Sequence, residues 1–194
     1  MQDYNKGIAL MIFTTFIFAI QDTTTKLLGN SMPVLQFLGI RYLVFFGFAV
    51  WWTTRKRPLR AVVKVKNVPV QLLRGVLLGL ESLLFAWALT HIGVGQMHSI
   101  FACFPLMVTA LSPLFLGEKV GLIRWLGILV GFLGTLVIIA PGSVSFSVYS
   151  WVAVGCAVLF AIYSLLTRYV ASTDSADSSL FYTGLMAAAV TAPF

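Results

Sequence analysis

The sequence predicts an all-α integral membrane protein, and three observations support this fold class. Hydrophobic residues make up 59% of the 194-residue chain and charged residues only 10%, whereas soluble domains carry about 25% charged residues. The apolar residues stand in runs of roughly 20, which is the length of a helix that crosses a bilayer. Lys and Arg gather in the connections between alternate runs, as the positive-inside rule requires of a multi-pass protein.

The first four apolar runs predict helices at residues 7–28, 33–52, 69–91 and 96–116. The first run is longer than the apolar region of a signal peptide and is therefore read as a retained span. Pro33 suits the first turn of the second helix. A polar, basic connection at residues 53–67 separates the second helix from the third. Pro105 and Pro113 each remove a backbone hydrogen bond from the fourth helix and predict a kink in it.

Three further runs predict helices at residues 120–140, at 147–170 and from about residue 180 onward. Gly117-Glu118-Lys119 turns the chain into the fifth helix, and Pro141-Gly142-Ser143 ends it. A polar stretch, Ala171 to Ser179, precedes the seventh helix. Because Phe194 still lies inside an apolar run, we expect this chain to be a fragment of a longer protein.

The basic residues predict the orientation in the membrane. The connection between the second and third helices holds six of them, Arg55, Lys56, Arg57, Arg60, Lys64 and Lys66, which places it in the cytoplasm. Alternation then puts the N-terminus and five more cations on the same side: Lys6, Arg74, Lys119, Arg124 and Arg168. The expected location is the cell (inner) membrane, with a cytoplasmic N-terminus. The same basic connection also suits acidic lipid headgroups.

The net charge of +7 does not indicate a nucleic-acid partner, because the cations follow the membrane topology. Cys103 and Cys156 lie inside apolar runs and are expected to pack there rather than form a disulfide. The sequence contains no His-Glu-x-x-His, Cys-x-x-Cys, Gly-x-Gly-x-x-Gly or Walker-type motif. We therefore expect no metal, no cofactor and no ATP-driven step.

A short pattern in the first helix recurs in the sixth. Phe18-Ala19-Ile20 is repeated as Phe160-Ala161-Ile162, and Thr25-Lys26 and Thr167-Arg168 follow at the same offset. The copies lie five helices apart, and this odd number turns the second copy over relative to the first. Such inverted repeats build many secondary transporters. Chance similarity between two apolar helices is the alternative.

The chain resembles EamA-type members of the drug/metabolite transporter superfamily. The residues that carry the resemblance are Gly7-Ile8-Ala9-Leu10, Phe18-Ala19-Ile20 with Lys26, Arg41-Tyr42, Pro113 to Lys119, Trp125-Leu126-Gly127, Gly131 to Gly134 and Pro141-Gly142. The resemblance implies a ten-helix transporter made of two five-helix repeats, with the first repeat at residues 1–140 and the start of the second at 141–194. It is closest to riboflavin and S-adenosylmethionine carriers and implies a small-molecule metabolite as substrate. The lipid bilayer is the other expected partner, and a homodimer is left open.

Ionisable residues inside the spans are the main candidates for a transport site, because a charge in hydrocarbon is costly. At about 1.5 Å per residue, Asp22, Arg41 and Glu81 lie roughly 9 to 15 Å below the outer ends of their helices. Arg41 could hold an anionic substrate group or pair with Asp22 or Glu81, and a carboxylate could exchange a proton to couple transport. The alternative is a structural ion pair, with Lys26 reaching the outer headgroups.

Polar and aromatic side chains could complete a binding pocket, and their rings could stack on an aromatic metabolite. The candidates are Gln21, Trp87, His91, Gln96, His98, Phe101, Phe104 and Tyr163. Their alternative is an interfacial or packing role. Gly127 and Gly131, with Gly134 near the same face, are expected to let helices approach closely.

Two other classes of protein compete with a transporter. An intramembrane enzyme would need a nucleophile and a base, or clustered ligands, at one depth. Only Asp22 and Glu81 could serve it, and no hydrolase-like signature accompanies them. A non-transporting membrane scaffold or assembly subunit would need no buried charges facing a cavity. The sequence therefore favours a transporter over an enzyme.

Overall fold

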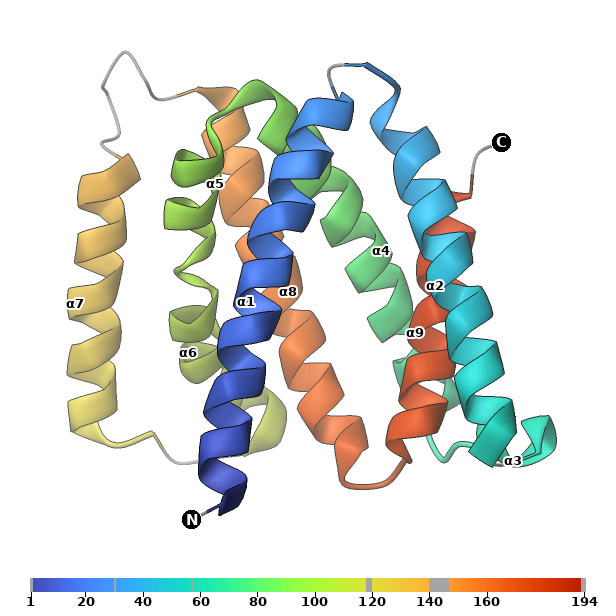
Figure 1. The fold of residues 1–194 in the computed structure, drawn as a ribbon. Coiled ribbons are helices and arrows are strands. Elements are labelled where there is room, and N and C mark those ends of the chain that lie inside the picture. The colour runs from blue at the N-terminus through green and yellow to red at the C-terminus, as the bar shows by residue number, and fades with distance from the viewer. Residues whose placement is uncertain (1, 30, 57, 118–119, 140–146, 193–194) are drawn as a thin grey trace.

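The computed structural model describes residues 2–29, 31–56, 58–117, 120–139 and 147–192, and all regular structure in these ranges is helical. The helices stand side by side and run alternately up and down (Figure 1). They are α1 (Gln2–Gly29), α2 (Val34–Lys56), α3 (Leu59–Val63), α4 (Val68–His91), α5 (Val94–Phe101), α6 (Phe104–Leu116), α7 (Leu122–Ile139), α8 (Val148–Ala171) and α9 (Ala176–Thr191). The predicted all-α fold class is confirmed.

Five stretches within the described residues are long and apolar enough to cross a bilayer. They comprise α1, α2, α4, α8 and the pair α5–α6 taken as one span; the described apolar part of α7 is shorter. The observed ends lie within a few residues of the predicted ones. The Pro141-Gly142-Ser143 turn and the end of the seventh predicted helix lie outside the described residues.

The structure adds two features that the hydropathy pattern did not predict. The basic connection contains the five-residue helix α3, whose Val62 is buried. The fourth predicted span is broken at Ala102 and Cys103, so that Pro105 lies in the first turn of α6. A proline needs no hydrogen-bond partner there, so the helix is interrupted before Pro105, and Pro113 lies inside α6.

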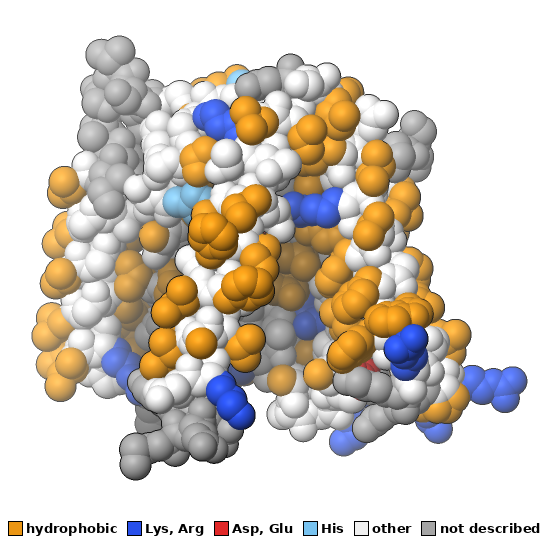
Figure 2. All heavy atoms as spheres, in the orientation of Figure 1, with side chains coloured by type: hydrophobic (Ala, Val, Ile, Leu, Met, Phe, Trp, Pro, Cys, Tyr) orange, Lys and Arg blue, Asp and Glu red, His pale blue; other side chains and the backbone are white. Residues whose placement is uncertain are grey.

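The exterior of the spans is apolar, whereas the ionisable residues Asp22, Arg74 and Glu81 are buried. Figure 2 shows hydrophobic side chains over one face and most Lys and Arg along the lower edge, the end at which the N-terminus and α3 lie. Met11 is 74% exposed and Ile123 86% exposed, whereas Arg74 is 2% and Glu81 5% exposed. A protein with this distribution suits hydrocarbon rather than water as its surroundings.

Helix α4 forms the centre of the packing, against α8 and α9. Two glycines allow α9 to approach closely. A Cβ added at Gly75 would lie 2.6 Å from the Cβ of Met186 and 2.9 Å from the carbonyl oxygen of Tyr182. At Gly79 it would lie 3.2 Å from the Cα of Ala187. Gly75 and Gly79 therefore form the small-xxx-small contact of this bundle.

The glycines that the sequence predicted as packing residues, Gly127, Gly131 and Gly134, lie in α7 and not at this contact. Among the described residues, an added Cβ at Gly127 or Gly134 meets no atom within 4 Å, and at Gly131 it meets only the side chain of Leu106. Helix α7 thus makes no close backbone contact through these three positions in this structure. The sequence signal was the same spacing of four residues, and it also stands at Gly75 and Gly79 in α4.

The packing of α4 on α9 predicts that two matched glycine substitutions differ in their effect on the free energy of unfolding. Gly75→Ala should destabilise the protein by about 1–3 kcal/mol, because the new methyl group meets backbone as well as side-chain atoms. Gly47→Ala, in α2 with nothing within 4 Å of the added Cβ, should be neutral or stabilising. Thermal unfolding of the detergent-solubilised protein measures both, and equal effects would contradict the packing.

Candidate functional site

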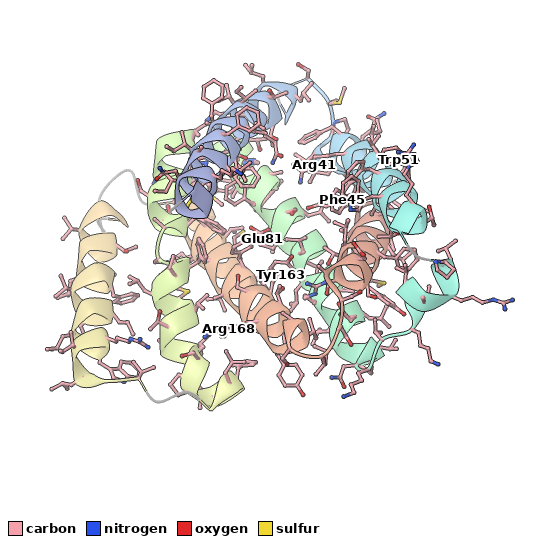
Figure 3. The ribbon with its side chains drawn as sticks, turned by 60° about the horizontal axis from the view of Figure 1, so that its bottom comes forward. Arg41, Phe45, Trp51, Glu81, Tyr163 and Arg168 are labelled. Atoms are coloured by element: carbon pink, nitrogen blue, oxygen red, sulfur yellow. The ribbon has the colours of Figure 1, made fainter. Side chains whose placement is uncertain are left out.

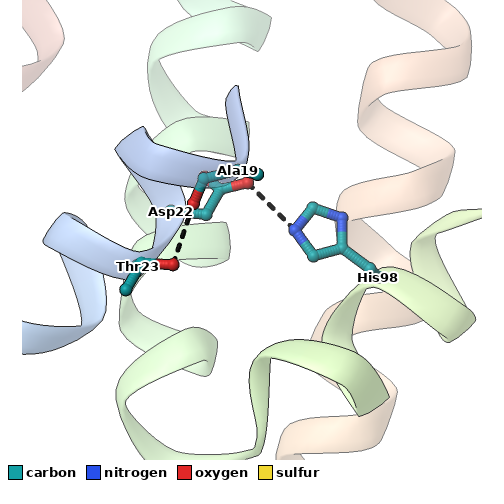
Figure 4. A network of polar contacts seen from close by, with 4 residues as sticks. All are labelled: Ala19, Asp22, Thr23 and His98. Atoms are coloured by element: carbon teal, nitrogen blue, oxygen red, sulfur yellow. Dashed lines mark hydrogen bonds and ion pairs between the residues drawn. The ribbon is translucent and has the colours of Figure 1, made fainter. Parts of the chain in front are cut away.

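An ion pair joins α1 to α5 in the half of the bundle away from the N-terminus. A side-chain oxygen of Asp22 lies 2.9 Å from Nε2 of His98, as Figure 4 shows. Asp22 is buried, and the pair is fully charged only when His98 is protonated. Thr23, beside it, donates to the carbonyl oxygen of Ala19 in its own helix. The structure therefore gives Asp22 a partner, His98, that the sequence had suggested only as a pocket residue.

Glu81 ends a chain of hydrogen bonds between α2 and α4. The hydroxyl oxygens of Tyr42 and Ser82 lie 2.6 Å apart, and Ser82 donates to Oε2 of Glu81 at 3.4 Å. When Ser82 donates to Glu81, Tyr42 donates its own hydroxyl hydrogen to the oxygen of Ser82. A buried carboxyl group is thereby linked through two hydroxyl groups to the neighbouring helix.

Arg41 lies close enough to interact electrostatically with both Asp22 and Glu81. Among the described residues it forms no direct ion pair with either, and its guanidinium carbon lies 4.8 Å from the centre of the Tyr42 ring. In Figure 3 the Arg41 and Glu81 side chains point toward the interior of the bundle. The three charges predicted to share a depth are thus brought into one electrostatic group.

A cavity of about 430 Å³ lies beside this group, between α1 and α2. It brings together two of the predicted site residues, Gln21 and Arg41. Its remaining lining consists of Thr24, Thr25, Leu28, Met32, Phe37 and Ile40. One cation and three uncharged polar side chains therefore face a largely apolar hollow.

The aromatic candidates fall into two groups. Phe101 contacts Phe85 and Phe160, with ring centres 5.2 and 5.4 Å apart, and Phe160 contacts Tyr163 at 5.6 Å. These rings connect α4, α5 and α8 through the middle of the bundle. Trp87 instead belongs to an outer cluster in which His91 stacks on Tyr149 at 4.1 Å. Phe101 and Tyr163 thus share one wall, and Trp87 is separate from it.

The sequence suggested that Lys26 could reach the outer headgroups, but the structure gives its ammonium group a partner within the protein. Its ammonium group donates to the carbonyl oxygen of Ile92 at 2.7 Å, directly after the end of α4. A cation at a helix C-terminus satisfies carbonyl groups that lack partners within the helix. Lys26 therefore fixes the C-terminal end of α1 to the C-terminal end of α4.

Sequence reasoning missed a second polar cluster, which surrounds Arg74 near the N-terminal end of α4. Arg74 was expected to be a topological charge, yet it is buried and bonded to residues of α8 and α9. Gln71 is also fully buried beside it and bonds to Asp174. The sequence did contain a signal for this cluster: Gln71, Arg74 and Glu81 are spaced by three and seven residues and therefore share one helix face.

A larger cavity of about 640 Å³ lies between α6, α7 and α8 and includes Gly127, Arg124 and Arg168 in its lining. It has no connection to the predicted site residues apart from Gly127. No group of three His, Cys, Asp or Glu side chains in the described part of the chain could hold a metal ion.

An apolar helix bundle that buries ionisable side chains from several helices beside a cavity has the features of a membrane transporter. The comparison with known families agrees. Residues 5–140 match the EamA-like transporter family, and the chain belongs to this family. The family and the curated relatives are named as transporters rather than enzymes.

Three relatives show the range of the similarity. A riboflavin transporter of Vibrio cholerae is 29% identical over 171 residues, which cover 88% of this chain and 53% of the relative. A pseudopaline exporter of Pseudomonas aeruginosa is 28% identical over 192 residues, covering 96% and 65%. An S-adenosylmethionine uptake transporter of Rickettsia prowazekii is 24% identical over 197 residues, covering 100% and 65%. The chain thus spans about half to two thirds of the length of these relatives. No solved structure gives a significant match.

The contact between Asp22 and His98 predicts that their substitutions are not additive. In a double-mutant cycle of Asp22→Asn and His98→Gln, the coupling in unfolding free energy should exceed about 0.5 kcal/mol. His91, which contacts Trp87 and Tyr149 instead, provides the matched control: Asp22→Asn and His91→Gln should be additive. Additive effects in both cycles would show that the contact does not form.

Proposed function

We propose that the protein to which this chain belongs is a secondary transporter that moves a small organic metabolite across the cytoplasmic membrane by alternating access. The observation that carries the proposal is that Asp22 and Glu81 are buried inside an apolar bundle and that Arg41, from a third helix, lines a cavity. Placing these charges inside an apolar bundle is costly, and a transport path explains why the cost is tolerated. The names of the family and of the relatives support the same activity.

The proposed orientation places the N-terminus and α3 in the cytoplasm. Both lie at the same end of the bundle in Figure 1, and α3 belongs to the connection that is richest in Lys and Arg. Arginine and lysine accumulate in cytoplasmic loops of multi-pass proteins. The cavity of Gln21 and Arg41 then belongs to the outer half of the membrane.

Arg41 is the proposed binding group for an anionic part of the substrate. Its guanidinium can donate several hydrogen bonds to a carboxylate or phosphate. The cavity of about 430 Å³ falls in the range of typical small-molecule sites. Gln21 and the threonines beside it offer further hydrogen-bond partners. S-adenosylmethionine, which one relative is named for, carries a carboxylate and is the first substrate to test.

Glu81 is the proposed proton carrier. Arg41 stabilises the charged form of a nearby carboxylate, and an anion bound to Arg41 would neutralise that effect. Substrate binding would then favour protonation of the carboxylate, so that an anion and a proton bind together and cross together. The hydroxyl chain from Tyr42 through Ser82 gives the proton a hydrogen-bonded partner on α2.

Replacing Glu81 tests this proposal. In proteoliposomes of the full-length protein, Glu81→Gln should abolish uptake driven by a pH gradient while leaving exchange of labelled for unlabelled substrate intact. The physical reason is that an amide cannot carry the coupling proton. Asp177→Asn removes a carboxylate in the first turn of α9, away from the site, and should leave uptake unchanged. Gradient-driven uptake at the wild-type rate in Glu81→Gln would contradict the proposal.

A further inference from the structure

Arg74 crosses the boundary between the two proposed repeats. One terminal nitrogen, Nη2, donates to the carbonyl oxygen of Ser179 and to Oγ1 of Thr183, both at 2.7 Å. The other, Nη1, donates to Oγ1 of Thr167 at 3.3 Å. Each of these acceptors lies on α8 or α9, whereas Arg74 lies on α4. A single guanidinium therefore ties the third span of the first repeat to both helices that follow residue 147.

Asp174, in the turn between α8 and α9, forms a second connection at the same end. Its carboxylate accepts from the side-chain nitrogen of Gln71 at 2.9 Å and from the backbone nitrogen of Lys66 at 3.0 Å. Tyr182 adds a third connection, because its hydroxyl donates to the carbonyl oxygen of Val63 at 2.8 Å. Gln71, Arg74 and Tyr182 are all buried, so the cytoplasmic end of this interface is closed.

The closed network is not fully satisfied. Among the described residues, Nε of Arg74 and Oε1 of Gln71 are buried and have no hydrogen-bond partner. Arg74 also bonds to uncharged acceptors, and hydrogen bonds exchanged for others cost little net free energy. These features suit a contact that opens and reforms.

Gly79 provides a fixed point outside this network. It lies five residues beyond Arg74 along α4, and an added Cβ there would come within 3.2 Å of the Cα of Ala187. Helices α4 and α9 therefore meet almost backbone to backbone at this level. Gly75, next to Arg74, makes a second close contact with α9, so rocking about Gly79 would separate the helices at Gly75 and at their inner ends without separating their middles.

We propose that Arg74, with Gln71 and Asp174, forms the cytoplasmic gate of the transport path, which opens about the contact of Gly79 with Ala187. The gate rests on the proposed function, because it has a role only in a protein that alternates between two open ends. When the inner side opens, the hydrogen bonds from Arg74 to Ser179, Thr183 and Thr167 must break.

If the gate exists, weakening the hydrogen bonds of Arg74 should expose the inner end of α9 to the cytoplasm. Ser178→Cys places a reporter at a side chain that is 2% exposed and bonds to Ser175 of its own helix. In inside-out vesicles of the full-length protein, adding Arg74→Gln should raise its rate of labelling by a charged thiol reagent about tenfold, a shift of about 1.4 kcal/mol toward the open state. Arg74→Lys should act in the same direction, because an ammonium group cannot reproduce the fork of the guanidinium.

Three controls separate a gate from a loss of structure. Thr191→Cys, at the outer end of α9 and fully buried, should stay unlabelled in every background. Arg60→Gln removes an exposed cation and should leave the reporter at position 178 unchanged. The parent protein without the introduced cysteine gives the blank, and the two native cysteines of this chain are buried. Thr183→Val removes one acceptor of Arg74 and should raise labelling at position 178 even if Arg74→Gln fails to fold.

Unchanged labelling at position 178 in the Arg74 variants and in Thr183→Val would overturn the gate. A parallel rise at positions 178 and 191 would overturn it as well, since it would mean that Arg74 supports the whole bundle. Labelling needs no substrate, so these outcomes are separate from the uptake assay that tests the proposed function.

Discussion

Hydrocarbon offers no partner to a charge, so the protein itself must satisfy every ionisable side chain inside its spans. This constraint accounts for the main contacts between the helices. Asp22 pairs with His98, Lys26 binds a carbonyl group at the end of α4, and Arg74 binds acceptors on α8 and α9. Two of these three contacts end on α4 or begin there. Helix α4 is central because it holds the polar partners of its neighbours.

The positions of the helices could be predicted because each one is fixed by its own apolar run. Helix α3 could not, since a five-residue helix is too short to leave a periodic signal. The role of Arg74 was misjudged for a different reason. A cation near the cytoplasmic end of a span satisfies the positive-inside rule whether it faces water or the interior. Only its position on one helix face with Gln71 and Glu81 indicates that Arg74 points into the bundle. The acceptors of Arg74 could not be predicted, because they depend on how α8 and α9 pack.

The candidate site was predictable in depth but not in pairing. Counting residues from the helix ends placed Asp22, Arg41 and Glu81 at one level, and the structure brings the three into electrostatic range. The choice of His98 as the partner of Asp22 depends on the contact of α1 with α5, which no local pattern encodes. Similarly, a spacing of four between glycines occurs in both α4 and α7, and only the packing shows that Gly75 and Gly79 are the pair in close contact.

Sided labelling of a cysteine introduced by Glu81→Cys tests most directly whether the buried charges line a path. Charged thiol reagents should reach it from the outside and from the cytoplasm in turn, with an imposed substrate gradient favouring one side. Leu43→Cys, at a half-exposed apolar position of α2, should be labelled from neither side because it faces lipid. A cysteine at position 81 that no reagent reaches from either side would contradict the account and leave Glu81 as a structural residue.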